Sequence, residues 1–204
     1  MTTSVHGHRL KSLLWAGLPI LLVAILRPWT IRPIERSTPA GFEPGSFAAS
    51  AWPRLLREAS QTAVDVAELT ATARAASSKA RFVKGAGTVS AIDRQSRAGL
   101  MRVQLVGAKP GTVAIQIGPV IRGTALRDAA SFIQFSDFIN QFDYAAAANA
   151  LNDYALRTVI ASASLETVQG RPITFVGAVG KTAAGDGTLE IVPILLEVPA
   201  TPGR

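Results

Sequence analysis

The chain has 204 residues, of which 48% are hydrophobic, and this is enough to fill one core of ordinary size. It has no Cys, which excludes disulfides, thiol chemistry, iron–sulfur clusters, the usual structural zinc sites and an acylated N-terminal cysteine. The formal net charge is +7, but residues 1–36 hold five Lys or Arg against one Glu, so the remainder carries only +3. No cluster of basic and aromatic residues accompanies that excess, and we expect no nucleic-acid partner.

The N-terminus is laid out like an export signal. Leu13 to Leu26 is a run of 14 uncharged residues that follows Arg9 and Lys11, and as a helix it would span ~21 Å. A cleaved signal peptide, an uncleaved anchor and a buried core helix are the alternatives. The run ends in Ile-Leu-Arg-Pro-Trp, which lacks the small residues that signal peptidase requires. We therefore predict an uncleaved transmembrane anchor over residues 1–27. Charge alone leaves its orientation open, and the export layout favours the periplasm.

The next two segments are a predicted stalk and a predicted helix. Residues 28–46 contain six Pro or Gly residues and suit an extended stalk. Apolar residues then recur at helical spacing, which predicts a helix over residues 47–76. Ser50 is its expected N-cap, Pro53 would lie in its first turn and Trp52 would anchor its packing.

From residue 77 to 204 the pattern predicts a mainly β domain of the α+β class. Strands with period-two alternation are separated by polar or Gly-containing turns, among them a hairpin turn at residues 185–187. An Ala-rich helix is expected over residues 144–162, and its expected buried face is Ala148, Leu151, Ala155, Val159 and Ile160. This helix lies between the third and fourth strands. This order is that of the five-stranded OB-fold barrel, with an open α+β sandwich as the alternative. Gly85 and Gly87 would let the first strand coil strongly enough to join both sides of a barrel. The predicted strands are residues 82–92, 100–106, 112–117, 172–179 and 189–198.

Residues 118–143 mix polar side chains with four Phe and several other apolar residues, which indicates either a hydrogen-bonded structural network or a ligand cleft. If Phe132, Phe135, Phe138 and Phe142 share a helical face, they dock the segment on the barrel and leave a polar rim suited to hydroxyl groups. In the structural alternative, Arg122 and Asp128 are buried and satisfy each other, and truncating Arg122 would cost ~3 kcal/mol. The candidate ligand-binding residues are Arg122, Asp128, Gln134, Asp137, Asn140 and Gln141.

The chemistry of the predicted domain does not favour an enzyme. The chain's two histidines, His6 and His8, both precede the predicted anchor, so Ser131 and Ser136 have no neighbouring base. The acidic residues match no calcium loop, and we expect no metal and no cofactor. A hydrolase that pairs Asp128 with Asp137 is the catalytic alternative. The glycines match neither a dinucleotide-binding fingerprint nor a P-loop.

The segment Gly118 to Asp143 resembles one family, together with the run Phe-Val-Lys-Gly-Ala-Gly that starts at Phe82 and the run Asn-Ala-Leu-Asn that starts at Asn149. The family is the predicted periplasmic lipoproteins grouped as domain of unknown function 2291. The similarity covers residues 47–198 and is most specific from Ile115 to Asn152. It implies an exported, membrane-tethered protein, often encoded beside sugar-uptake ATP-binding-cassette transporters, and it implies no activity. This chain departs from the lipoprotein pattern because it has no Cys to acylate.

Three hypotheses for function follow. The first is a non-catalytic accessory protein that is anchored in the inner membrane, faces the periplasm and contacts the subunits of a sugar transporter or its solute-binding protein. The second is a module that binds a carbohydrate or another polar small molecule in the cleft of residues 118–143. The third is the hydrolase with paired Asp residues.

Overall fold

The computed structural model describes residues 41–72, 79–97, 99–107, 111–163, 165–180 and 188–199. The predicted anchor, residues 28–40 of the predicted stalk and the expected hairpin turn at residues 185–187 lie outside the described residues. Among the described helices, none combines the length and apolar character needed to cross a bilayer.

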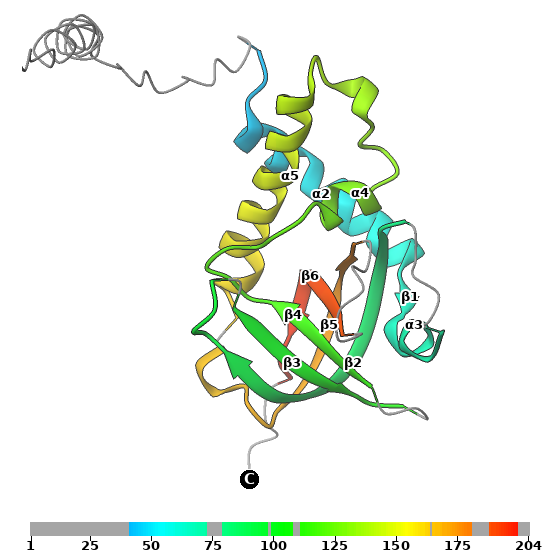
Figure 1. The fold of residues 1–204 in the computed structure, drawn as a ribbon, viewed down its shortest axis with the longest axis vertical. Coiled ribbons are helices and arrows are strands. Elements are labelled where there is room, and N and C mark those ends of the chain that lie inside the picture. Colours follow the sequence, from blue (N-terminus) through cyan, green and yellow to red (C-terminus); the bar gives the residue numbers. More distant parts are fainter. Residues whose placement is uncertain are drawn as a thin grey trace, which may run out of the picture. The chain divides into compact units, whose positions relative to one another are not determined.

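Five of the strands close into a barrel (Figure 1). Their order is β2-β3-β4-β6-β5, and β5 pairs back onto β2. The β4–β6 pair is parallel, and the other barrel pairs are antiparallel. The predicted OB-type barrel is therefore confirmed, and the open sandwich is excluded because no edge is left between β2 and β5. The strands are β2 (Arg81–Asp93), β3 (Leu100–Leu105), β4 (Thr112–Gln116), β5 (Pro172–Val179) and β6 (Leu189–Glu197).

The long strand β2 closes the barrel because it coils from one side to the other. Its first half pairs with β5 and its second half with β3, with a register shift between Val89 and Ala91. A Cβ atom on Gly85 would lie 2.7 Å from both the Phe175 ring and the Val66 side chain, and one on Gly87 would meet the backbone carbonyl of Gln104. Both positions therefore require glycine for close packing rather than for a turn.

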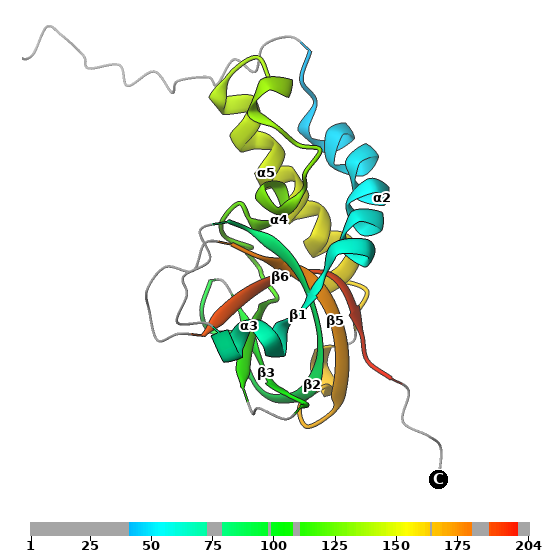
Figure 2. The same cartoon turned by 90° about the vertical axis from the view of Figure 1, so that its right-hand side faces the viewer.

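A layer of helices covers one side of the barrel (Figure 2). It contains α2 (Pro44–Thr62), α4 (Ala125–Ala129) and α5 (Gln141–Ala155). Trp52 of α2 is buried and packs its ring 4.9 Å from that of Tyr154 on α5, as predicted for a packing anchor. This layer and the outer side of β2, β5 and β6 share one apolar core, whereas a second core fills the barrel interior.

The predicted N-terminal helix has different ends. It begins at Pro44, so Pro53 lies inside it and Ser50 is not its N-cap; the Ser50 hydroxyl donates to the Phe47 carbonyl instead. It ends at Thr62 rather than at residue 76, because the chain leaves the helix there to form β1 (Val64–Asp65), which pairs parallel to β2. A short helix, α3 (Val66–Thr72), follows, and Val66 is fully buried against the barrel strands.

The second predicted helix is confirmed with small changes at its ends. Helix α5 continues into a π-helical turn, η2 (Leu156–Ile160), so the helical region spans residues 141–160. The predicted buried residues are buried: Ala148, Leu151, Ala155, Val159 and Ile160. A single turn of 3-10 helix, η3 (Leu165–Thr167), then leads to β5.

Candidate functional site

The segment from Gly118 to Asn140 connects β4 to α5, and three of the six predicted site residues bond through their side chains to nearby backbone. The backbone N–H of Gln134 donates to Asp137 Oδ2 at 2.9 Å, and the Gln134 side chain completes a capping box around the 3-10 turn η1 (Phe135–Asp137). Asn140 is the N-cap of α5, because its Oδ1 accepts from the N–H groups of Phe142 and Asp143 at 2.8 and 3.0 Å. Gln141 is exposed in the first turn of α5.

The expected buried pair of Arg122 and Asp128 is wrong. Arg122 is exposed, and its backbone N–H donates to Gln116 Oε1 at 2.8 Å. Asp128 instead pairs with its neighbour Arg127, whose Nη2 lies 2.6 Å from Asp128 Oδ1. The pairing changes because α4 turns Arg127 inward, where its guanidinium lies 3.6 Å above the Tyr144 ring centre and donates to the Tyr144 carbonyl.

The hydrolase alternative needs two carboxylates free to act together. Asp128 accepts from Arg127 and, at 2.6 Å, from the Thr124 hydroxyl, whereas Asp137 accepts from the Gln134 backbone. The two carboxylates therefore stabilise different turns of the segment.

Two buried polar residues outside the predicted set form hydrogen bonds beside this segment, one within the barrel wall and one from α5. Gln116 on β4 donates through Nε2 to Glu190 Oε2 at 3.2 Å. Asn152 on α5 donates through Nδ2 to the Gly123 carbonyl at 2.9 Å, and its buried Oδ1 has no hydrogen-bond donor among the described residues. A polar residue at an apolar position of a strand or helix is the signal that could have found both of them.

The four Phe side chains of the segment do not share a helical face, because α4, an irregular turn and η1 interrupt the backbone. Phe138 packs edge-on against Phe42 and Phe47, with ring centres 5.4 and 5.6 Å away. Phe132 instead lies beneath the Arg54 guanidinium. The even spacing of the Phe residues in the sequence therefore predicted the wrong geometry.

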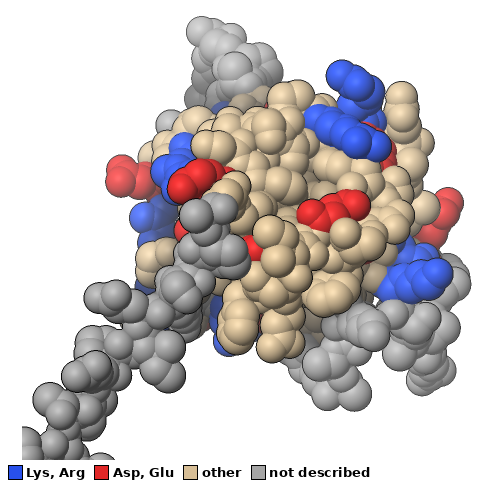
Figure 3. Space-filling view, turned by 90° about the horizontal axis from the view of Figure 1, so that it is seen from above, with Lys and Arg blue, Asp and Glu red and all other residues tan. Residues whose placement is uncertain are grey.

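Three other large apolar side chains of this region face outward. Phe135 is 56% exposed, Ile139 80% and Phe142 69%, and we call these three residues the apolar tip. Figure 3 looks onto this end of the helical layer, and most of its visible surface belongs to uncharged residues. Large exposed side chains gathered in so short a segment commonly mark a contact surface.

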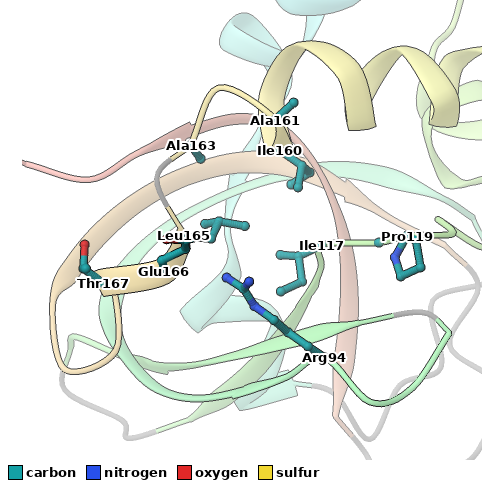
Figure 4. Close-up of a pocket in the computed structure, with 10 residues that line it drawn as sticks. Arg94, Ile117, Pro119, Ile160, Ala161, Ala163, Leu165, Glu166 and Thr167 are labelled. Carbon is teal, nitrogen blue, oxygen red and sulfur yellow. The ribbon is translucent and has the colours of Figure 1, made fainter.

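A separate cavity of about 590 Å³ opens at one end of the barrel (Figure 4). Its walls come from the β2–β3 turn, from the residues after β4 and from the connection between α5 and β5. Of the predicted segment only Gly118 and Pro119 line the cavity, and none of the six candidate residues does so. The lining residues are Arg94, Ile117, Gly118, Pro119, Ile160, Ala161, Ala163, Leu165, Glu166 and Thr167.

Arg94 supplies the positive charge in the lining of this cavity. Figure 4 shows its side chain extending between Ile117 and Leu165 with the guanidinium toward the cavity. The preceding residue, Asp93, holds the turn, since its Oδ1 accepts from the backbone N–H groups of Gln95 and Ser96 at 2.9 and 3.3 Å. Those two hydrogen bonds lower the pKa of the Asp93 carboxyl. Glu166 and Thr167 line the same cavity, so its walls combine a cation, a carboxylate and a hydroxyl with apolar side chains, which suits a small molecule with both polar groups and an apolar body.

Comparisons with known proteins address the family and the fold. A protein-family model described as predicted periplasmic lipoprotein (DUF2291) matches residues 20–197. The crystal structure of an OB-fold protein from Thermotoga maritima MSB8 is similar to the chain with 20% sequence identity and a TM-score of 0.60, and the match covers 78% of this chain and 99% of that chain. At that identity the likeness establishes the fold alone. The search of curated proteins found no match.

Proposed function

The chain belongs to the predicted periplasmic lipoprotein family DUF2291, and we propose that it acts as a non-catalytic accessory protein tethered to the periplasmic face of the inner membrane. The chain has no Cys, so no cysteine can carry a lipid. The uncharged run from Leu13 to Leu26 would take over the tethering role, with Trp15 and Trp29 near the membrane interfaces.

The place where the chain enters the domain is the observation that carries this proposal. Phe42 packs on Phe47 and Phe138, next to the start of α5. From there α5 and η2 run along residues 141–160 to the cavity of Arg94, and the 15 residues of α5 alone measure about 22 Å. A tether attached at Phe42 would therefore join the domain at its helical end, and the barrel cavity lies at the other end of α5 and η2.

The partner we propose is a subunit of a sugar-uptake ATP-binding-cassette transporter or its solute-binding protein. The resemblance of the stretch from Ile115 to Asn152 to the family supports this choice. It implies that the gene lies beside the genes of such a transporter. Within this region, the side chains of Asp128, Asp137 and Asn140 each accept hydrogen bonds from nearby residues. An accessory role requires only a stable surface.

Co-purification of the full chain from native membranes tests this function. In a mild detergent, transporter subunits should accompany the protein from cells growing on the transported sugar. Repeated recovery of the protein alone would contradict the accessory role. Carbonate washing tests the tether separately, because an integral anchor stays in the membrane pellet whereas a peripheral protein appears in the wash.

Binding of a small molecule is the second candidate function, and the cavity of Arg94 favours it over the six residues first predicted. Aliphatic carboxylates, sugar phosphates and neutral sugars should be compared by thermal shift of the full chain in detergent. A ligand of micromolar Kd at millimolar concentration stabilises by about 4 kcal/mol. The stabilisation should disappear in Arg94→Gln and remain in Arg97→Gln, an exposed residue of the same turn outside the cavity lining. Equal stabilisation of both variants would exclude this site.

A further inference from the structure

We propose that the apolar tip, Phe135, Ile139 and Phe142, inserts into the interface of the lipid bilayer beside the tether. The inference rests on the proposed tether and adds a second, non-covalent contact with the same membrane. Two contacts would fix the orientation of the domain, with α5 directed away from the membrane and the barrel cavity at its far end.

The tip is held on a rigid base. The ring of Phe135 packs edge-on against Tyr144 with centres 5.4 Å apart, and Tyr144 in turn lies beneath the buried Arg127. Asn140 caps α5 between Ile139 and Phe142. Because the backbone on both sides of the tip is fixed in this way, the three side chains cannot fold back into the core, and another surface must cover them to remove them from water.

The position of the tip favours a bilayer as that surface. Phe42, the second described residue, has its ring 5.4 Å from that of Phe138, which lies between Phe135 and Ile139 in the chain. Fifteen residues separate Leu26 from Phe42, and they reach at most ~50 Å when fully extended. The chain therefore enters the domain beside the tip, and a tether of this length lets the tip reach the membrane.

The size of the tip favours lipid over a protein partner, and its charge predicts how the contact depends on salt. Residues 41–53 and 129–156 contain no Lys or Arg, and Glu43 and Asp137 are exposed beside the tip. The contact would therefore depend on apolar insertion and not on attraction to anionic headgroups, and it should resist salt. Three exposed side chains are also few against the roughly 20–30 residues a side of a stable protein interface.

Site-specific labelling tests the contact, since the chain has no Cys and one introduced Cys is unique. The full-length Ile139→Cys variant, labelled with a fluorophore and reconstituted in phosphatidylcholine vesicles, should be quenched by lipids that carry a nitroxide near the headgroup. Val106→Cys is the matched control, because Val106 is 72% exposed and directly follows β3, in the barrel rather than in the helical layer. We expect quenching several-fold stronger at position 139 than at 106, unchanged between low and high salt.

Removal of the neighbouring rings provides the second measurement. Adding Phe135→Ser and Phe142→Ser to the Ile139→Cys variant should reduce quenching to the level of the Val106 label, and both rings are exposed enough to be lost without unfolding the domain. Equal quenching at 139 and 106 in protein that resists carbonate washing would overturn this inference and leave the tether intact. Release of the protein by carbonate would instead contradict the tether itself.

Discussion

Arg127 is the side chain that joins most parts of the connection between β4 and α5. Its guanidinium donates to Asp128 Oδ1 from Nε and Nη2 and to the Tyr144 carbonyl from Nη1 at 3.0 Å, while its face covers the Tyr144 ring. It is the buried member of the pair, and Asp128 remains partly exposed. Removing the cation would leave the Tyr144 carbonyl without this donor and Asp128 Oδ1 without its two hydrogen bonds from Arg127.

Truncation of this side chain should therefore be costly. We expect Arg127→Met to lower the free energy of unfolding by about 2–3 kcal/mol, because hydrogen bonds to a charged group and a cation–π contact are lost together. Arg122→Met is the matched control, since Arg122 is exposed and only its backbone is hydrogen-bonded among the described residues. Its effect should stay within about 0.5 kcal/mol. Denaturant titration measures both, and a larger loss in Arg122→Met would reverse this assignment.

At the scale of elements, α5 depends on one residue for its start. Asn140 accepts two backbone N–H groups of the first turn, and its Nδ2 donates to the buried Asp143 at 3.1 Å. Asn140→Ala should therefore destabilise the protein by about 1 kcal/mol. Asn149→Ala, at an exposed position in the middle of the same helix, should cost nothing, because Ala has the higher helix propensity. Thermal unfolding of the two variants separates a capping role from a general intolerance of Ala in α5.

Strand β2 can pack against β3 only if position 87 has no side chain. A Cβ atom at Gly87 would meet the Gln104 carbonyl and lie 2.6 Å from Val103. Gly87→Ala should thus cost about 2 kcal/mol through overpacking of the β2–β3 pair. Gly45→Ala in α2 meets nothing within 4 Å and should change stability by less than about 1 kcal/mol. Chemical unfolding of both variants tests this, and equal effects would show that close packing at Gly87 is unimportant.

At the scale of the whole domain, the two cores are coupled through the barrel wall. The adjacent residues Phe82 and Val83 of β2 face the helical core and the barrel core, respectively, and Leu156 and Leu196 pack against both. Opening one core therefore exposes apolar surface of the other. The described helices and the barrel should behave as one cooperative unit.

Native-state hydrogen exchange tests this coupling. The slowest amides of α5 and β5 should report the same free energy of opening, and Leu151→Ala, in the core of α5, should lower both by about 2–5 kcal/mol. If that substitution lowers protection in α5 alone and leaves β5 unchanged, the helical layer opens independently of the barrel.

The local pattern of apolar residues was sufficient to predict the strands of the barrel. The alternation of apolar residues placed β5 at its observed bounds and the other strands within about two residues, because each strand buries one face and must repeat every second residue. The Ala-rich run and its buried face were predicted for the same reason at helical period. Strand order followed because short turns leave few ways to connect five strands and one helix.

The candidate site could not be predicted to the same degree. Six polar residues were selected by their type, but the structure uses Asn140 and Asp137 to cap turns, and it is Arg127 rather than Arg122 that turns inward. The prediction also missed Arg94. This residue stands 24 residues before Gly118 in the chain, and the two line one cavity only because β2, β3 and β4 pair side by side in the barrel.

The amino-acid sequence alone determined the strands, the central helix, the OB-type order and the family, since each depends on neighbours along the chain. Tertiary structure decided the end of α2 at Thr62, the partner of Asp128, the cavity of Arg94 and the exposure of the apolar tip. The physical reason is that periodicity records which face of an element is buried. An ion pair, a cavity or an exposed patch depends instead on which distant segments the closed fold brings together.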